Sequence, residues 1–393
     1  MFADEREKQG FANRLAVYYG AVFVIYGIQL PLLPLWLDWR GLSATEIGVV
    51  SALPLVARIV LSPMIAMVAD RTAAHRTAVI LLAWLGAIAA VLLDWSSTAL
   101  AISAVVFVLL IATTTAMPLA EAIAMAGVRA GALDYGRMRL WGSVTFIVAN
   151  VAGGLLVAAH GTAFVAYGLL AGALMTVAGA HLLPVVAQGT ATSQRPPTRD
   201  AARRLVTNPA FLLLVTAAGG IQASHAVFYA FGVLHWRDSG LSTGWTGALW
   251  AIGVLVEVGL LAISGRAVAM LGARGLLMVG GAAGVVRWAV MALDPPLAVL
   301  VPLQMLHGAT FAATHIGTVH IAQALAPKGT EGTSQAILSA VTAGIAMGGA
   351  MALSGPLYAH FGAASYLAMA ALAAAGLIAA ALLAPVVPPT AQS

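Results

Sequence analysis

The chain has 393 residues, of which 61% are hydrophobic, and only 33 are charged, 19 Lys and Arg against 14 Asp and Glu. A soluble domain of this size would carry about a quarter charged residues. The deficit excludes an ordinary soluble enzyme and a disordered chain, and the absence of cysteine excludes a disulfide scaffold and thiol chemistry. The net charge of +5 does not indicate nucleic-acid binding, because the basic residues are too thinly spread for a phosphate-binding stripe.

Apolar runs of about 20 residues predict twelve helices that cross a lipid bilayer. They lie near 14–37, 45–69, 77–93, 98–126, 136–159, 163–183, 208–234, 244–264, 275–293, 297–325, 332–359 and 363–385. We therefore expect an all-α integral membrane protein with two six-helix halves, 1–187 and 208–393. The segment 188–207 is polar and Pro-rich, which is typical of a flexible connector.

The distribution of Lys and Arg predicts the orientation of the chain in the membrane. With the N-terminus in the cytoplasm, fifteen of the 19 basic residues fall in inner segments, and only Arg40 and Arg237 fall in outer loops. We expect a multi-pass protein of the bacterial inner membrane, with both termini and the connector in the cytoplasm.

A weak internal repeat runs through the chain at an offset of about 199 residues. Gly-Leu-Ser at 41–43 recurs at 240–242, Gly48 corresponds to Gly247, and Arg76 falls near the counterpart of Arg274. Two halves of the same orientation form a parallel repeat, which is typical of transporters that rock about a central site.

With these features the chain resembles the major facilitator superfamily over essentially its whole length. The loop 69–76, Ala-Asp-Arg-Thr-Ala-Ala-His-Arg, resembles the superfamily's motif between helices 2 and 3, although the motif's first glycine is missing. The resemblance implies the superfamily fold and a gating role for Asp70, Arg71 and Arg76.

Four charged residues lie inside or close to the predicted spans: Arg58, Glu121, Glu257 and Arg287. An ionised side chain in mid-bilayer costs from about 2.5 to over 10 kcal/mol, so each needs a reason. Two acids and two bases can neutralise one another and hold helices together, or they can form a site for protons and anions. Arg58 and Glu257 occupy equivalent positions of the repeat, 199 residues apart.

Uncharged polar and aromatic residues mark two further helix faces. The face with Gln222, His225 and Tyr229 is expected to line a cavity, since lipid would not accept the amide of Gln222. The face with Tyr19, Phe23 and Tyr26 is interpreted either as packing or as a surface that holds a substrate ring. His307 lies far from both ends of its span, and a histidine there can titrate near neutrality.

Four segments resemble the proton-coupled oligosaccharide and nucleoside symporters, and in most detail the 3-phenylpropionic acid permease family. They are 134–143 (Asp-Tyr-Gly-Arg-Met-Arg-Leu-Trp-Gly-Ser), 250–258, 286–288 and 304–311. The resemblance implies that Glu121, Arg139 and Glu257 line the substrate site. It also implies that Arg287 and His307 belong to the proton-coupling group.

The chain departs from the symporter pattern at Gln304 and Thr310, where that group has Lys and Glu. Glu257 therefore becomes the leading proton carrier, grouped with His307 and Arg287, because a carboxyl group in a low-dielectric cavity is easily protonated. Its protonation is expected to release Arg287 or another cation for a substrate anion. Candidate substrate-binding residues are Glu121, Arg139, Arg58, Gln222, His225 and Tyr26.

The sequence thus favours a proton-coupled symporter of a small organic solute, such as an aromatic carboxylate. A nucleoside or sugar symporter and a proton-driven exporter remain alternatives. A membrane-embedded enzyme is disfavoured, because His-Glu-x-x-His, Gly-x-Ser-x-Gly and clustered aspartates are all missing from the sequence. We expect protons and a small molecule as partners in the lipid bilayer, no cofactor besides the proton gradient, no metal, no nucleic acid, and a monomer.

Overall fold

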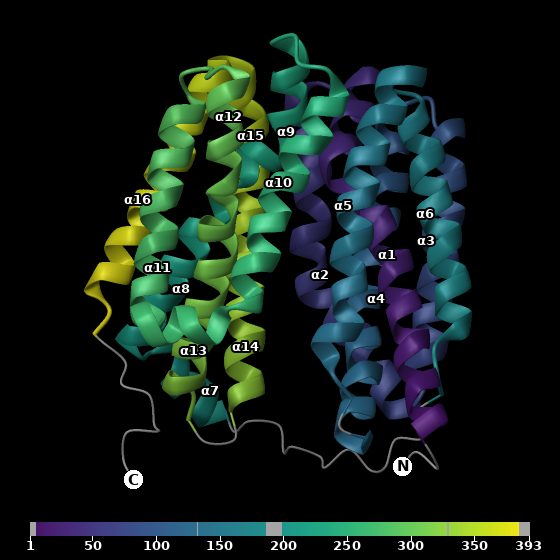
Figure 1. Ribbon diagram of the computed structural model, residues 1–393, viewed down its shortest axis with the longest axis vertical. Coiled ribbons are helices and arrows are strands. Elements are labelled where there is room, and N and C mark those ends of the chain that lie inside the picture. The colour runs from purple at the N-terminus through teal and green to yellow at the C-terminus, as the bar shows by residue number, and fades with distance from the viewer. Residues whose placement is uncertain (1–4, 132, 186–198, 328–329, 385–393) are drawn as a thin grey trace. The chain divides into compact units, whose positions relative to one another are not determined.

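The computed structural model describes residues 5–131, 133–185, 199–327 and 330–384, and all regular elements in these ranges are helical (Figure 1). Eleven helices of the described residues are long and apolar enough to cross a membrane. The last of them, Gly332–Leu382, contains the final two predicted spans, so the twelve predicted spans are present. The expected all-α membrane fold is confirmed.

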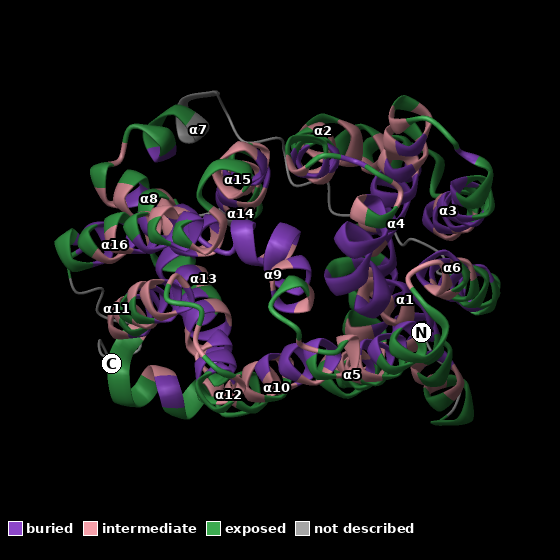
Figure 2. Ribbon diagram, turned by 90° about the horizontal axis from the view of Figure 1, so that it is seen from above, coloured by how far each residue is buried: buried purple, intermediate pink, exposed green. Residues whose placement is uncertain are grey.

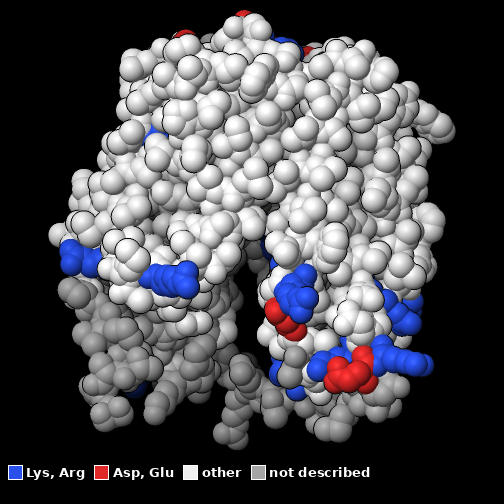
Figure 3. All heavy atoms as spheres, in the orientation of Figure 1, with Lys and Arg blue, Asp and Glu red and all other residues white. Residues whose placement is uncertain are grey.

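The chain divides into two compact units. One contains Met1–Gly189 and Gly232–Ala251, and the other contains Thr190–Phe231 and Ile252–Ser393. On the face shown in Figure 3, most of the visible charged side chains lie in the lower half of the view, and the upper half is nearly free of them. This distribution is expected of helices whose sides contact lipid.

The first unit is built from six long helices. These are α1 (Glu5–Trp39), α2 (Ala44–Thr72), α3 (His75–Trp95), α4 (Ala99–Gly131), α5 (Tyr135–His160) and α6 (Phe164–Leu182). Helix α1 packs against α5 and α6, and α4 packs against α3 and α2. Helices α1, α3, α4 and α6 each have many buried residues, whereas few residues of α2 are buried (Figure 2).

The segment Gly232–Ala251 groups with the first unit although it follows the predicted connector. It comprises the end of α9 (Ala226–Asp238) and the start of α10 (Thr243–Ala262). A Cβ atom on Gly154 of α5 would lie 2.4 Å from the Thr243 carbonyl oxygen, and one on Gly247 would lie 2.4 Å from that of Asn150. This backbone approach, which only glycine permits, holds α10 against α5.

The second unit contains shorter helical pieces. They are α7 (Arg199–Val206), α8 (Pro209–Ala223), α11 (Ser264–Met291), α12 (Leu297–Met305), η1 (Gly308–Ala313), α13 (Thr314–Leu325), α14 (Glu331–Ser339), η2 (Ala340–Ala346), α15 (Met347–Phe361), η3 (Gly362–Ser365) and α16 (Tyr366–Leu382). Helix α11 packs on α16 and α13, and α16 packs on α8. The pieces η1 and η2 are π-helical, a form that often occurs at functional sites.

The predicted span 208–234 is interrupted between α8 and α9. The Ser224 hydroxyl donates to the Ile221 carbonyl (2.6 Å), and the His225 ring bonds the Gln222 carbonyl (3.0 Å). These side chain–backbone bonds compete with the helical ladder and break it. Hydropathy averages over such a break, so the sequence did not reveal it.

The part of the predicted connector before Arg199 lies outside the described residues. Its remaining part is not a loop, because Arg199–Val206 forms helix α7. Leu205 of this helix is buried in a core cluster with Phe211 and Leu214 of α8. The apolar contact of Leu205 explains why this stretch of a polar segment is helical.

The predicted repeat has a structural counterpart in the turns. Gly41 and Gly240 both adopt positive φ angles, +85° and +88°, in the Gly-Leu-Ser segments whose serines precede α2 and α10 by one residue. Ser43 caps α2 through a capping box with Glu46. The recurrence of this turn supports the superfamily fold of two pseudo-symmetric halves.

Candidate functional site

The second unit contains a polar cluster centred on Arg287 of α11, whose side chain is completely buried. Its guanidinium donates to Gln304 Oε1 (2.7 Å), His307 Nδ1 (3.1 Å) and Thr310 Oγ1 (3.2 Å). All three acceptors are neutral groups. Among the described residues of its unit, Arg287 forms no ion pair with a carboxylate.

Two aromatic rings cover the faces of this guanidinium. The central carbon of Arg287 lies 4.8 Å from the ring centroid of Phe228 and 4.5 Å from that of Trp288. Trp288 is itself held by a hydrogen bond from its indole N–H to the Ser224 hydroxyl (2.8 Å), at the break between α8 and α9. The rings stabilise the cation without neutralising it.

The hydrogen bonds determine which nitrogen of His307 carries a proton. A guanidinium can only donate, so His307 Nδ1 accepts from Arg287 and the proton lies on Nε2. Nε2 in turn faces Glu257 Oε2 of α10 at 3.4 Å. The neutral imidazole thus connects the cation to the carboxylate. In this unit Glu257 thus approaches Arg287 through His307, which lies between them.

A second branch of hydrogen bonds leads from Arg287 to His225. His225 Nδ1 donates to the Gln222 backbone carbonyl (3.0 Å), and His225 Nε2 accepts from the Thr310 hydroxyl (3.0 Å). Gln222 contributes only its backbone, since its amide forms no hydrogen bond with the described part of the chain.

In the first unit, Arg139 of α5 lies against aromatic residues of α1. Its guanidinium carbon stands 4.0 Å from the Phe23 ring centroid and 5.6 Å from that of Tyr19. Phe23 meets Tyr26 edge to face at 5.2 Å, and the Tyr26 hydroxyl donates to the Thr113 carbonyl (2.8 Å). Arg139 forms no hydrogen bond or ion pair with a described residue of this unit.

The other charged candidates of the first unit also have no charged partner among the residues that the structure describes. Glu121 of α4 accepts a hydrogen bond from the Tyr135 hydroxyl (3.2 Å). Arg58 of α2 is half-buried. Within the described residues of the first unit, the sequence-predicted acid and bases thus do not form ion pairs with one another.

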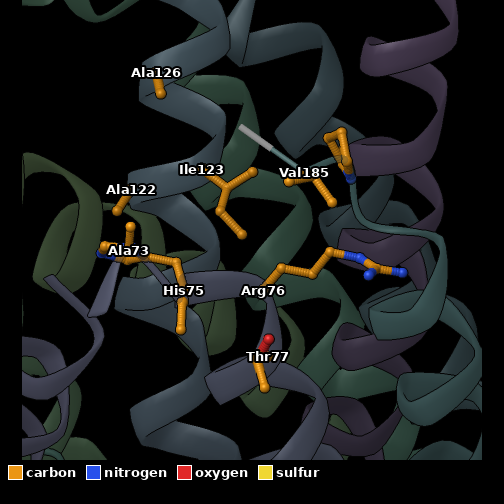
Figure 4. Close-up of a pocket in the computed structure, with 10 residues that line it drawn as sticks. Ala73, His75, Arg76, Thr77, Ala122, Ile123, Ala126 and Val185 are labelled. Carbon is orange, nitrogen blue, oxygen red and sulfur yellow. The ribbon is translucent and has the colours of Figure 1, made fainter. Parts of the chain in front are cut away.

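The predicted gating residues lie where α2 ends and α3 begins, with Asp70 and Arg71 at the end of α2 and Arg76 at the start of α3. Asp70 Oδ1 contacts Nε2 of the buried His75 at 2.9 Å, and Arg71 is exposed. Arg76 donates to the carbonyls of His181 (2.6 Å) and Leu183 (2.7 Å) at the end of α6. His75 and Arg76 border a pocket of about 90 Å³ that α4 and the chain after α6 complete (Figure 4). Arg76 thus holds the start of α3 against the end of α6.

An equivalent contact between an arginine and the end of a helix occurs in the second unit. Arg274 of α11 donates to the carbonyls of Ala380 (3.3 Å) and Ala381 (2.6 Å) at the end of α16. A cation at a helix C-terminus satisfies unpaired carbonyls and the negative end of the helix dipole. Arg76 and Arg274, which the repeat pairs, therefore make equivalent contacts.

Comparison with known proteins places the chain in a family. The model of the MFS_1 like family matches residues 12–368. The chain belongs to the MFS_1 like family. It is a multi-pass membrane transporter of the major facilitator type, and the resemblance found in the sequence is confirmed.

Two curated relatives of this transporter are similar over most of their length. It is 31% identical to the "Probable 3-phenylpropionic acid transporter" of Escherichia coli (strain K12) over 363 residues, 91% of this chain and 93% of the relative. It is 29% identical to the "Maltose permease" of Geobacillus stearothermophilus over 351 residues, 86% of each.

Solved structures agree on the fold. The nucleoside transporter NupG superposes with a TM-score of 0.79 at 17% identity, covering 95% of this chain and 98% of that one. A bacterial homologue of the human lysosomal transporter Spinster superposes with a TM-score of 0.72 at 14% identity, covering 97% and 95%. At these identities the comparison supports the fold alone.

The sequence did not predict several residues of the clusters around Arg287 and Arg139. Trp288 and Phe228 cover Arg287, and Tyr135 bonds Glu121. The sequence offered one signal, because Trp288 directly follows Arg287. Tyr135 opens α5 just after its N-cap Asp134, but nothing in the sequence shows that its hydroxyl turns toward α4.

Proposed function

We propose that this transporter carries a small aromatic carboxylate, such as 3-phenylpropionate, together with protons. The observation that supports it most directly is the first-unit cluster, where Arg139 lies over the rings of Tyr19 and Phe23 and has no acidic partner among the described residues. The 31% identity to the probable 3-phenylpropionic acid transporter points to the same substrate class.

The chemistry of this cluster suits an anion with an attached ring. Arginine binds a carboxylate through two parallel hydrogen bonds, and the gain is large where water is scarce. Edge-to-face contacts with aromatic side chains are worth about 0.5–1.5 kcal/mol beyond the area that they bury. We therefore assign Arg139 to the carboxylate and the aromatic face of α1 to the ring.

We propose that Glu257 takes up the transported proton. While Glu257 is ionised, its charge offsets that of Arg287 through the bridging ring of His307. Protonation removes the negative charge and leaves the cluster with a net positive charge inside the membrane. An anion bound within the membrane-spanning part of the protein lowers the cost of this charge, so proton and anion binding favour each other, and reciprocity requires that each strengthens the other equally.

Uptake of labelled 3-phenylpropionate into proteoliposomes tests this proposal. We expect an inward proton gradient to accelerate uptake by the wild type, and Glu257→Gln to abolish that acceleration. Glu5→Gln, an exposed acid near the N-terminus, is the control and should behave as the wild type. If the rate of uptake by the wild type does not depend on the proton gradient, proton coupling is refuted. If the wild type takes up no aromatic acid, the proposed substrate class is refuted.

A neutral polyol is the second candidate substrate. Glu121 has free lone pairs beyond the one that Tyr135 uses, and carboxylates readily accept hydrogen bonds from sugar hydroxyls. The 29% identity to the maltose permease is consistent with this alternative. Competition of labelled 3-phenylpropionate by uridine, maltose and aromatic acids would rank the classes.

We propose that both termini face the cytoplasm of a bacterial inner membrane, as the distribution of basic residues indicates. Because the chain lacks cysteine, single-cysteine variants report on sidedness directly. We expect an impermeant maleimide to label Ser239→Cys from outside, and to label Thr207→Cys only after the membrane is opened. The reverse pattern would contradict the orientation.

A further inference from the structure

An acid and a base of the first unit lie near the same tyrosines without pairing. The Tyr135 hydroxyl lies 3.2 Å from Glu121 Oε1 and its ring meets that of Tyr19 at 6.4 Å, while the Arg139 guanidinium carbon lies 5.6 Å from the same Tyr19 ring. Opposite charges within a membrane span normally pair, because each alone is expensive to bury. The structure instead gives Glu121 a hydroxyl partner and gives Arg139 an aromatic one. Something in the cluster therefore competes with the ion pair.

Tyr135 is placed to be that competitor. Its hydroxyl donates to Glu121 Oε1 at 3.2 Å, and its ring meets Tyr19 edge to face at 6.4 Å and 90°. The start of α5 fixes its backbone, because the Asp134 side chain accepts a hydrogen bond from the Arg137 N–H (3.1 Å). The contact with Tyr19 and the helix cap at Asp134 thus hold Tyr135 in place while its hydroxyl binds the Glu121 carboxylate.

Arg139 stands one turn further along the same face of α5. Residues four apart on a helix are neighbours, so Tyr135 and Arg139 approach the same region from one element. The guanidinium lies over Phe23 at 4.0 Å, which stabilises the cation but uses none of its N–H donors. The hydrogen-bonding edge of Arg139 is left available for a ligand.

We propose that Tyr135 is a positioning residue that holds Glu121 away from Arg139 and so keeps this arginine available for a carboxylate. This inference rests on the proposed function for the identity of the ligand, but not for the state of Arg139. If Tyr135 has this role, its hydroxyl is a determinant of the transporter's preference for anions over neutral solutes. Without the hydroxyl, Glu121 is free to pair with Arg139 and competes with the substrate for it.

The first experiment follows Arg139 without any ligand. Purified wild type and Tyr135→Phe are treated with the arginine reagent phenylglyoxal, and the modification rate of Arg139 is measured by peptide mass spectrometry. We expect Tyr135→Phe to slow the modification about fivefold, the effect of a new ion pair of ordinary strength. The double variant Tyr135→Phe/Glu121→Gln should restore the rate, since the competing charge is gone. Equal rates in wild type and Tyr135→Phe would overturn the inference.

The second experiment measures equilibrium binding of two probes with the same ring, 3-phenylpropionate and its neutral amide 3-phenylpropionamide. We expect Tyr135→Phe to weaken binding of the acid about fivefold and to leave that of the amide unchanged, with rescue in the double variant. Tyr167→Phe, an exposed tyrosine of α6, serves as the matched control. Equal loss for both probes would mean that Tyr135 only maintains the fold, and would refute its positioning role.

The two experiments separate this inference from the proposed function. If the wild type binds neither probe while the Arg139 modification rates follow the expected pattern, the substrate proposal is wrong and the role of Tyr135 stands. If the wild type binds 3-phenylpropionate but the modification rates and affinities do not respond to Tyr135→Phe, the role of Tyr135 is wrong and the substrate proposal stands.

Discussion

Gln304 supplies the shortest hydrogen bond to the buried guanidinium, and its removal gives a prediction of stability that depends on few assumptions. Gln304 Oε1 accepts from Arg287 Nη2 at 2.7 Å, and both side chains are almost completely buried. The variant Gln304→Met keeps the volume and removes the acceptor. A hydrogen bond to a charged group is worth about 1.5–3 kcal/mol, so we expect a loss of about 2 kcal/mol in the free energy of unfolding.

Reversible unfolding in sodium dodecyl sulfate, followed by circular dichroism, measures this loss. The cost arises because Arg287 is left with an unsatisfied donor, so removing both partners in Gln304→Met/Arg287→Met should recover much of it. We expect Thr310→Val to lower the free energy of unfolding by less than Gln304→Met does, since the bond from Arg287 to Thr310 is longer, at 3.2 Å. A loss below about 0.5 kcal/mol for Gln304→Met, or strict additivity of the two changes, would refute the reasoning.

The remaining predictions concern packing and the repeat. In Gly247→Val, the Cβ atom would lie only 2.4 Å from the Asn150 carbonyl oxygen. We expect this clash to lower the thermal midpoint by the equivalent of about 1–3 kcal/mol. Gly259→Val on the same helix has open space and is the control; an equal effect would contradict the packing argument. Arg76→Ala and Arg274→Ala should destabilise by similar amounts, about 1–3 kcal/mol each, because both remove donors from helix-end carbonyls. A large effect in only one of them, measured by the same unfolding assay, would show that the two contacts are not equivalent.

The positions of the spans and the membrane class could be predicted because they depend on composition averaged over about 20 residues. The fold of two related halves followed from the repeat, which places glycine at the matched turns of Gly41 and Gly240. The sequence analysis also identified Arg287, His307 and Glu257, since charge and polarity are rare within apolar spans and stand out there.

The order of contacts within the clusters could not be predicted in the same way. It depends on rotamers and on helix breaks that span one or two residues. The bond between Trp288 and Ser224 exists only because the helix breaks there, and the π-helical η1 shifts the register that carries Thr310. A helical wheel drawn from the sequence assumes a regular ladder and therefore misplaces such residues.

The equal numbers of acids and bases in the spans left open whether they pair and hold helices together or form a site for protons and anions, and among the described residues of each unit Arg139 and Arg287 do not pair directly with an acid. Glu121 is bonded by a phenol and Glu257 is approached by an imidazole, while Arg139 and Arg287 lie on aromatic rings and neutral acceptors. A direct pair would have been satisfied permanently and could not respond to a proton or an anion. Neutral side chains placed between the charges leave both kinds of group able to change partners, which is the property that coupled transport requires.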